Sequence, residues 1–148
     1  MGVEIERKFL VNEAEWQDVK PVKGTHILQG YLSKEIERTV RVRVKGEKGF
    51  LTVKGKNTGA KRAEFEYEIP IQEAKEMLET MCDAYIDKIR YEVHFGGKIW
   101  EVDEFSSPKR GLILAEVELN DENEAIDFPS WITDEVTNDK NYYNSNMI

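Results

Sequence analysis

Cysteine is almost absent from this 148-residue sequence, in which Cys82 is the single example. One cysteine cannot form an intrachain disulfide, and it cannot supply the multi-cysteine motifs that hold structural zinc. Long apolar runs are also missing, so no segment reaches the length that a membrane-spanning helix needs. Charged residues follow Met1 closely, where a secretory signal peptide would carry an apolar stretch. Together these features predict a cytoplasmic protein with no membrane partner.

Net positive charge is missing as well, since the formal net charge is -8 and the pI is near 4.9. Such a surface is repelled by the phosphates of DNA and RNA, which argues against nonspecific binding of nucleic acid. The charged fraction is nevertheless 34%, so a local basic site can exist within the acidic total. The length suits one domain with a real core, and no repeat or linker interrupts it. We therefore predict a single domain over residues 1–148.

Alternation of apolar and polar residues is the main pattern of the sequence, and it predicts β-strands. In the first strand Glu4, Glu6 and Lys8 share one face, while Val3 and Ile5 lie on the other. The predicted strands cover residues 3–10, 25–33, 39–45, 50–54, 61–69, 84–95, 98–105 and 111–119.

Helices are predicted in three places. Asn12 is a candidate N-cap for a short helix that ends before Pro21, and residues 72–81 carry apolar side chains at helical spacing. A third, short helix is predicted over residues 129–136. The strands follow one another at hairpin spacing, which suggests an antiparallel sheet that curls into a barrel. The predicted fold is α+β, mainly β: an eight-stranded antiparallel β-barrel with helices packed outside.

Charged side chains occupy one face of nearly every predicted strand, and two interpretations of that face are open. In one, the face meets water, and opposite charges pair across strands for only ~0–1 kcal/mol each. In the other, the face lines the lumen of the barrel, and the apolar rows turn outward beneath the helices. Two details favour a charged lumen: the rows are almost purely ionic, and the signs are grouped by strand. Bases gather on residues 41–54, and acids gather on residues 101–118 and at the start.

A lumen with these two groups of charges has a chemical use. Paired carboxylates can hold a hard divalent cation such as Mg²⁺ or Mn²⁺. Rows of Arg and Lys can hold the oxygens of a polyanion, and Arg can do so with two parallel hydrogen bonds. Acids, bases and a metal are together the combination that binds a metal–phosphate chain and neutralises the charge on a transferred phosphoryl group.

The order of these residues resembles the signature of the CYTH superfamily, also called triphosphate tunnel metalloenzymes, and in particular its small bacterial members. The resemblance spans residues 3 to about 144, and its motifs are specific as an ordered set, although each is weak alone. It implies an eight-stranded tunnel that is open at both ends and binds a triphosphate with a divalent metal. The motifs are Glu4-x-Glu6-x-Lys8, Arg41-x-Arg43, Lys54, Arg62-x-Glu64-x-Glu66, Lys88-x-Arg90, Asp103 and Glu116-x-Glu118.

The resemblance also implies roles for individual residues. The residues expected to bind phosphate oxygens are Lys8, Arg41, Arg43, Lys54, Arg62, Lys88, Arg90 and, by a looser match in the C-terminal segment, Lys140. The expected metal ligands are Glu4, Glu6, Asp103, Glu116 and Glu118. The expected catalytic carboxylates are Glu116 and Glu118, together with Glu64 and Glu66, which would position the attacking water or serve a second metal.

Members of this family differ in activity, and hydrolysis of inorganic tripolyphosphate to phosphate and diphosphate is the expectation for a small bacterial type. Thiamine triphosphate hydrolysis, class IV adenylate cyclisation and a noncatalytic polyphosphate-binding module are the alternatives. The sequence leaves open the physiological substrate, the number of metals, and the oligomeric state, with a homodimer as one way to cover apolar outer rows. It also leaves open the roles of Glu68, Glu101, His94 and Tyr31. For Cys82 and His94 a structural role is the default expectation, and His26 carries no pattern that favours a functional one.

Overall fold

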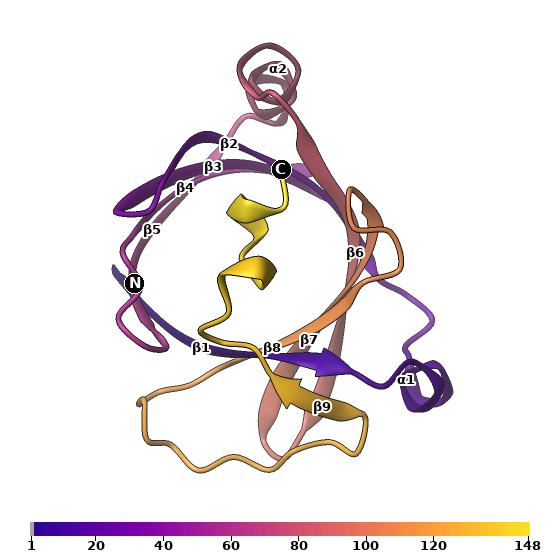
Figure 1. Cartoon of the computed structure of the whole chain (residues 1–148). Helices are drawn as coiled ribbons and strands as arrows, with labels where there is room; N and C mark the ends of the chain where they lie inside the picture. The colour runs from indigo at the N-terminus through magenta and orange to yellow at the C-terminus, as the bar shows by residue number, and fades with distance from the viewer. Residues whose placement is uncertain (1) are drawn as a thin grey trace.

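The computed structural model describes residues 2–148, and its main feature is an antiparallel sheet that closes on itself (Figure 1). This confirms the predicted eight-stranded antiparallel barrel. The strands are β1 (Gly2–Val11), β2 (Thr25–Glu35), β3 (Arg38–Lys45), β4 (Lys48–Gly55), β5 (Lys61–Ile69), β6 (Tyr85–Phe95), β7 (Lys98–Ser107), β8 (Ile113–Glu118) and a short ninth strand, β9 (Ile132–Glu135). The helices are α1 (Glu13–Val19) and α2 (Ile71–Met81), followed by the 3-10 turns η1 (Lys140–Tyr142) and η2 (Asn144–Asn146).

Strand β1 closes the barrel because its two halves pair with strands from opposite ends of the sheet. The strands follow the order β5-β4-β3-β2-β6-β7-β8-β1, and β1 then pairs with β5. The first half of β1 pairs with β5, with Glu4 opposite Arg62, and the second half pairs with β8, with Lys8 opposite Glu116. Closure leaves no free edge among these eight strands, and the alternation of side chains then separates an inner from an outer face.

The helices predicted after Asn12 and over residues 72–81 form where the sequence places them, and both cover the outer face of the barrel. Asn12 caps α1, since its side chain accepts a hydrogen bond from the backbone N–H of Glu15 at 3.0 Å. Helix α2 buries Ala74 and Leu78 against the outer face of β3. The longest helix in residues 2–148 is α2, with 11 residues, and no helix there is long and apolar enough to cross a membrane.

The helix predicted over residues 129–136 is wrong, because this segment forms β9. Its neighbour is β1, with Phe9 opposite Glu135 and Val11 opposite Ile132. Strand β5 pairs only with the first residues of β1, so the later residues on the same edge of β1 are not paired with β5. β9 takes that edge, and hydrogen bonds that a short helix would make internally are replaced by bonds to β1.

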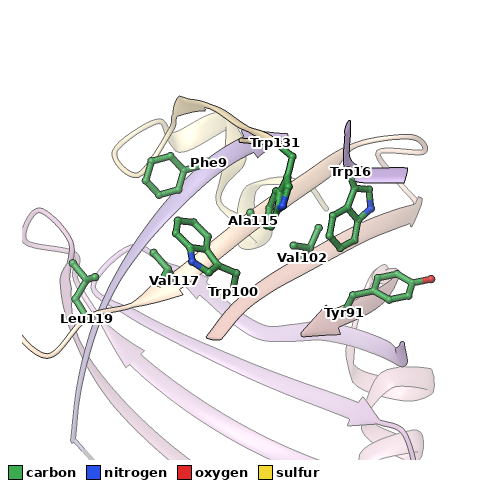
Figure 2. Close-up of a cluster of buried hydrophobic side chains, with 9 residues drawn as sticks. All are labelled: Phe9, Trp16, Tyr91, Trp100, Val102, Ala115, Val117, Leu119 and Trp131. Carbon is green, nitrogen blue, oxygen red and sulfur yellow. The ribbon is translucent and has the colours of Figure 1, made fainter. Parts of the chain in front are cut away.

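Apolar side chains pack on the outside of the barrel, as the charged-lumen interpretation requires. The largest cluster joins Trp16 of α1, Trp131 of the segment between β8 and β9, and Trp100 of β7, with ring centroids 5.2–6.1 Å apart. Figure 2 shows these rings between the sheet and the segments that cover it. Trp16 and Trp100 are fully buried. The outer apolar rows of β1, β7 and β8 are thus covered by α1 and by the chain leading to β9.

A second apolar cluster lies inside the ring of strands and corrects the expectation of a tunnel open at both ends. Ile86, Phe105 and Leu114 share strand faces with lumen residues, and they pack against Val136 and Met147 of the C-terminal segment. Figure 1 shows this segment, in yellow, within the ring. The sequence gives no periodic signal for such a contact. One end of the lumen is therefore filled by an apolar core, and the charged part is a cavity above it.

Candidate active site

The charged faces of the strands meet in one cavity of about 230 Å³. It is lined by thirteen of the residues singled out from the sequence, and their placement excludes the interpretation in which this face meets bulk water. Eight basic and seven acidic side chains line it, so the cavity is slightly positive inside a chain whose net charge is -8. The sequence-derived residues that line it are Glu4, Glu6, Lys8, Arg41, Arg43, Lys54, Arg62, Glu64, Glu66, Lys88, Arg90, Glu116 and Glu118.

Carboxyl groups of the cavity lie in pairs that shift each other's pKa. Glu6 of β1 and Glu116 of β8 form one pair. Burial, together with the charges of Glu116 and Glu4, raises the pKa of Glu6 well above its usual range. Burial also opposes ionisation of Glu116, but Lys8 and the hydrogen bond from Glu6 lower the pKa of Glu116 below its ordinary value. Glu6 is therefore the weaker acid of the pair.

Glu4 and Glu64 form the second carboxyl pair, and Lys54 lies between them. Lys54 Nζ donates to both carboxylate oxygens of Glu4 at 3.0 Å and lies 3.4 Å from Glu64 Oε2. Burial works against the ionised form of Glu4, but Lys54 and Glu64 lower the pKa of Glu4. Burial and the charge of Glu4 raise the pKa of Glu64. Here too the pKa of one carboxyl is lowered and that of its neighbour is raised.

Arginines on β3 and β5 present guanidinium groups to the same cavity. Arg41 Nη2 lies 3.3 Å from Thr52 Oγ1 and 3.4 Å from Glu66 Oε2, and its buried Nε–H has no acceptor among the described residues. Arg62 is fixed by bonds to the backbone oxygen of Gly55 at 2.6 Å and to Thr39 at 3.0 Å. A buried N–H without an acceptor is costly, and an anion in the cavity would supply the missing acceptor.

Asp103 was expected to be a metal ligand, but basic side chains bind its carboxylate oxygens. Arg90 donates to its two carboxylate oxygens at 2.7 and 2.9 Å, and Lys88 Nζ lies 2.8 Å from Oδ2. Burial alone would raise the pKa of Asp103, but Arg90 and Lys88 lower it well below its usual range. Asp103 is 1% exposed and does not line the cavity. The side chain holds two cations rather than facing the space where a metal would bind.

The remaining predicted residue, Lys140, also lies away from the main cavity. It is exposed on η1 and borders a smaller cavity of about 60 Å³, beside Lys34 and Arg62. Glu66 and Glu118 line the main cavity but are exposed, so they stand near its opening. Glu68, whose role was left open, is exposed and outside the lining residues.

Several lining residues were missed in the sequence. Lys45 continues the alternation of Arg41 and Arg43, so its parity was a usable signal. Glu101, whose role was left open, also lines the cavity and stands at the same parity as Asp103. Tyr31 also lines the cavity, whereas His94 does not. No pattern could have found the lining residues of irregular segments, because long-range packing brings them there. Those residues are Asn57, Ala60, Thr137, Tyr143, Asn144 and Ser145.

The donor set of the cavity fits a hard divalent cation. Within residues 2–148, no group of three or more His, Cys, Asp or Glu side chains stands in a metal-holding arrangement. The two carboxyl pairs nevertheless bring like charges together, and the raised pKa of Glu6 reports that repulsion. A divalent cation would allow both members of a pair to ionise, and carboxylate oxygens are the ligands that Mg²⁺ and Mn²⁺ prefer.

The fold and this cavity define a closed eight-stranded antiparallel barrel with an ionic lumen of paired acids and clustered bases. The family model for the CYTH domain matches residues 2–147, and the chain belongs to the CYTH domain family.

Comparison with known proteins finds two bacterial relatives along nearly the whole chain. The inorganic triphosphatase of Acetivibrio thermocellus is 48% identical over 149 residues, covering 100% of this chain and 94% of that protein. The inorganic triphosphatase of Nitrosomonas europaea is 34% identical over 145 residues, covering 95% of this chain and 93% of that protein. A crystal structure of an inorganic triphosphatase superposes with a TM-score of 0.66 at 30% identity, covering 97% of this chain and 92% of the other.

Proposed function

We propose that this protein is a metal-dependent triphosphatase that hydrolyses inorganic tripolyphosphate to phosphate and diphosphate in the barrel lumen. The observation that carries the proposal is the cavity itself, in which seven acidic and eight basic side chains converge. Its slightly positive lining suits a polyanion that arrives with a cation. The relatives along the whole chain, both inorganic triphosphatases, support the same substrate class.

The basic residues divide by the groups that surround them. Lys8, Arg41 and Lys54 line the cavity beside its carboxylates, and Arg41 keeps a buried N–H without an acceptor among the described residues. We assign these residues, with Arg62, to the phosphate oxygens nearest the opening. Arg43, Lys88 and Arg90 are held by Gln29, Asn144 and Asp103. We assign these three to the deep end of the phosphate chain, where they would neutralise the leaving diphosphate.

The acids are assigned to the metal and to the attacking water. Glu4, Glu6, Glu116 and Glu118 are the proposed ligands of one Mg²⁺ or Mn²⁺ ion. When bound, the ion would screen these carboxylates from the phosphates and lower the pKa of a bound water. Glu64 and Glu66, on β5 beside β1, are proposed to orient that water toward the terminal phosphorus. Asp103 is proposed to act indirectly, by holding Arg90 and Lys88 in position.

Among the carboxylates that line the cavity, Glu116 is the one that its neighbours hold most firmly in the ionised form. Lys8 and the proton on Glu6 lower its pKa, so it stays ionised throughout the neutral range. With a cation bound, Glu6 would ionise as well, and an ionised carboxylate beside the ion can accept a proton from water. We therefore propose Glu116 as the carboxylate that would both bind the metal and receive the water proton. The water oxygen forms a bond to the terminal phosphorus as the bond from that phosphorus to the bridging oxygen breaks, and diphosphate leaves.

The test is phosphate release from tripolyphosphate by the purified protein with Mg²⁺ or Mn²⁺. Release should depend on the metal and stop with a chelator, and Glu116→Gln should abolish turnover while tripolyphosphate binding persists. A panel with diphosphate, ATP and thiamine triphosphate would rank substrates, and cyclic AMP formed from ATP would point to a cyclase instead. Absence of phosphate release from tripolyphosphate with either metal, at neutral and alkaline pH, overturns the proposal.

A further inference from the structure

The floor of the cavity is built around Asn144, a residue of the C-terminal segment rather than of the barrel. Asn144 Oδ1 accepts a hydrogen bond from Lys88 Nζ at 3.0 Å and another from Gln29 Nε2 at 3.2 Å. These donors come from β6 and β2, and Asn144 begins the turn η2 that lies inside the ring of strands (Figure 1). One amide oxygen thus joins two walls of the lumen to the segment between them.

Both donors to Asn144 continue into buried ionic side chains. Gln29 is fully buried, and its Oε1 accepts from Arg43 Nε at 2.8 Å and Nη2 at 2.5 Å. Lys88 lies 2.8 Å from Asp103, which holds Arg90 with two bonds. The result is one continuous chain of contacts across the lumen, which we call the floor network. Its members are Arg43, Gln29, Asn144, Lys88, Asp103 and Arg90.

The floor network determines how many donors remain for a phosphate at the deep end. An ammonium group has three N–H donors. Lys88 directs one to Asp103 and one to Asn144, so one remains. Arg41, on the wall, differs because its buried Nε–H has no acceptor among residues 2–148. A phosphate chain that enters the cavity therefore finds one donor without an acceptor, that of Arg41, on the wall and largely occupied donors at the floor.

We propose that Asn144 is a positioning residue that sets how far a phosphate chain enters the cavity. Its amide stands where a deeper phosphate oxygen would otherwise accept from Lys88, and it holds Gln29 and hence Arg43 in place. The inference rests on the proposed function and adds a specificity-determining residue to it. Because the amide is neutral, Asn144 occupies this position without the repulsion that a carboxylate would exert on a phosphate.

Removing the amide should let the chain slip inward. In Asn144→Ala, the second donor of Lys88 is free to bind a phosphate oxygen, and the space of the amide is vacated. A phosphate chain held deeper would carry its terminal phosphorus away from the carboxylates of β1 and β8. Misplacement by about 1 Å can lower a rate about 100-fold. Diphosphate, which needs only to bind, should bind about tenfold more tightly through the freed donor.

Three variants separate positioning from a merely structural role. Asn144→Ala should lower kcat at least tenfold without raising KM, and diphosphate should inhibit it more strongly. Asn144→Asp keeps the oxygen that accepts both hydrogen bonds, so it should fold like the wild type, but its charge should raise KM and weaken diphosphate inhibition. Asn141→Ala is the matched control, since Asn141 is an exposed residue of the same segment outside the cavity lining. It should leave kcat, KM and inhibition unchanged.

Calorimetric titration of each folded variant with diphosphate and with tripolyphosphate, without turnover, provides a readout that does not depend on hydrolysis. Wild-type hydrolysis with unaltered kinetics and unaltered diphosphate affinity in Asn144→Ala overturns the positioning role and leaves the proposed function standing. Wild-type binding without hydrolysis overturns the proposed function, whereas a tighter diphosphate complex of Asn144→Ala still supports the positioning role. Absence of binding to the wild type overturns both.

Discussion

Replacing Asp103 by Asn should destabilise the protein more than any other single change of one charge in the cavity. The Asp103 carboxylate accepts two bonds from Arg90 and lies 2.8 Å from Lys88, and all three residues are at most 8% exposed. Asn has the same shape but no charge, and its amide nitrogen would face a guanidinium donor. Lys88 would then lack its counter-ion, and Arg90 would keep only its longer contacts to Glu101 at 3.4 Å and Glu116 at 3.7 Å.

The size of the effect follows from the burial of these partners. Breaking a buried ion pair by removing one partner costs ~3–5 kcal/mol, because the other charge is left uncompensated. We expect the lower part of that range, ~3 kcal/mol, since burial already lowers the pKa of Lys88 to about 7 and Asp103 opposes that shift. Without Asp103, Lys88 would lose its proton at neutral pH and relieve part of the strain. For a chain of this size, the expected fall in Tm is roughly 6–12 °C.

Urea unfolding at pH 7 measures this difference as a free energy. The pKa of Asp103 is lowered, so its contribution is fully present above the unfolded-state value and is lost as the pH falls toward the folded-state value. The gap between wild type and Asp103→Asn should therefore shrink as the pH falls below the ordinary value of an aspartate. Asp87→Asn is the matched control, because Asp87 pairs with exposed His26, and it should cost at most ~1 kcal/mol.

The reasoning about Asp103 is refuted by a loss below ~1 kcal/mol at pH 7, equal to that of the Asp87 control. A gap that widens in acid would refute it as well, since that sign belongs to a group whose pKa is raised by folding. Retained metal-dependent turnover in a destabilised Asp103→Asn protein would fit the positioning role. Selective loss of metal affinity with unchanged stability would restore Asp103 as a ligand.

Other substitutions test the remaining parts of the structure. Glu6→Gln should raise the Tm of the metal-free protein, because it removes a buried carboxyl whose pKa is raised by burial and by Glu116. The same substitution should abolish the rise in Tm on adding Mg²⁺. A fall in Tm without metal would contradict this. Arg41→Ala should raise KM for tripolyphosphate about tenfold or more through loss of a charge-assisted bond, and steady-state kinetics would show it; an unchanged KM would remove Arg41 from the phosphate contacts. Trp100→Ala should cost ~3–5 kcal/mol in urea unfolding, since this side chain is fully buried. Burial lowers the pKa of Lys88 to about 7, so above that pH Lys88 is protonated in the unfolded chain but not in the folded one. The free energy of unfolding should therefore rise from about pH 7 toward the ordinary lysine pKa. Lys88→Met should remove that rise.

The strands of the barrel could be predicted because each carries the same two-residue alternation of charge and apolar side chain. Arg41 and Arg43 on β3 and Glu116 and Glu118 on β8 share strand faces, so their common side followed directly from spacing. The β9 segment could not be predicted in the same way. Its strand conformation depends on a free edge of β1 that exists only after β5 has paired elsewhere.

Parity along a strand does not identify the partner of a side chain, and Asp103 shows the consequence. Its inward parity was read correctly, yet Arg90 stands directly opposite on β6 and takes both of its oxygens. Asn144 shows a different limit. Its place at the cavity floor depends on Met147 and Val136 packing against Ile86, and no local pattern marks such a contact.

One lumen can bind both a cation and an anion because its acceptor groups differ in charge from one part of the lumen to another. Carboxylates on β1 and β8 are crowded enough to raise the pKa of Glu6, which suits a metal, whereas Arg43 is held by the neutral amide of Gln29. Gln29 and Asn144 orient Arg43 and Lys88 without cancelling their charge, as a carboxylate would. Negative charge reaches this end through Asp103, which is buried behind the two cations it holds, and through Glu101 and Glu116, which lie 3.4 and 3.7 Å from Arg90. Arg43 therefore keeps the positive charge that a leaving diphosphate requires, while its geometry is fixed before the substrate arrives.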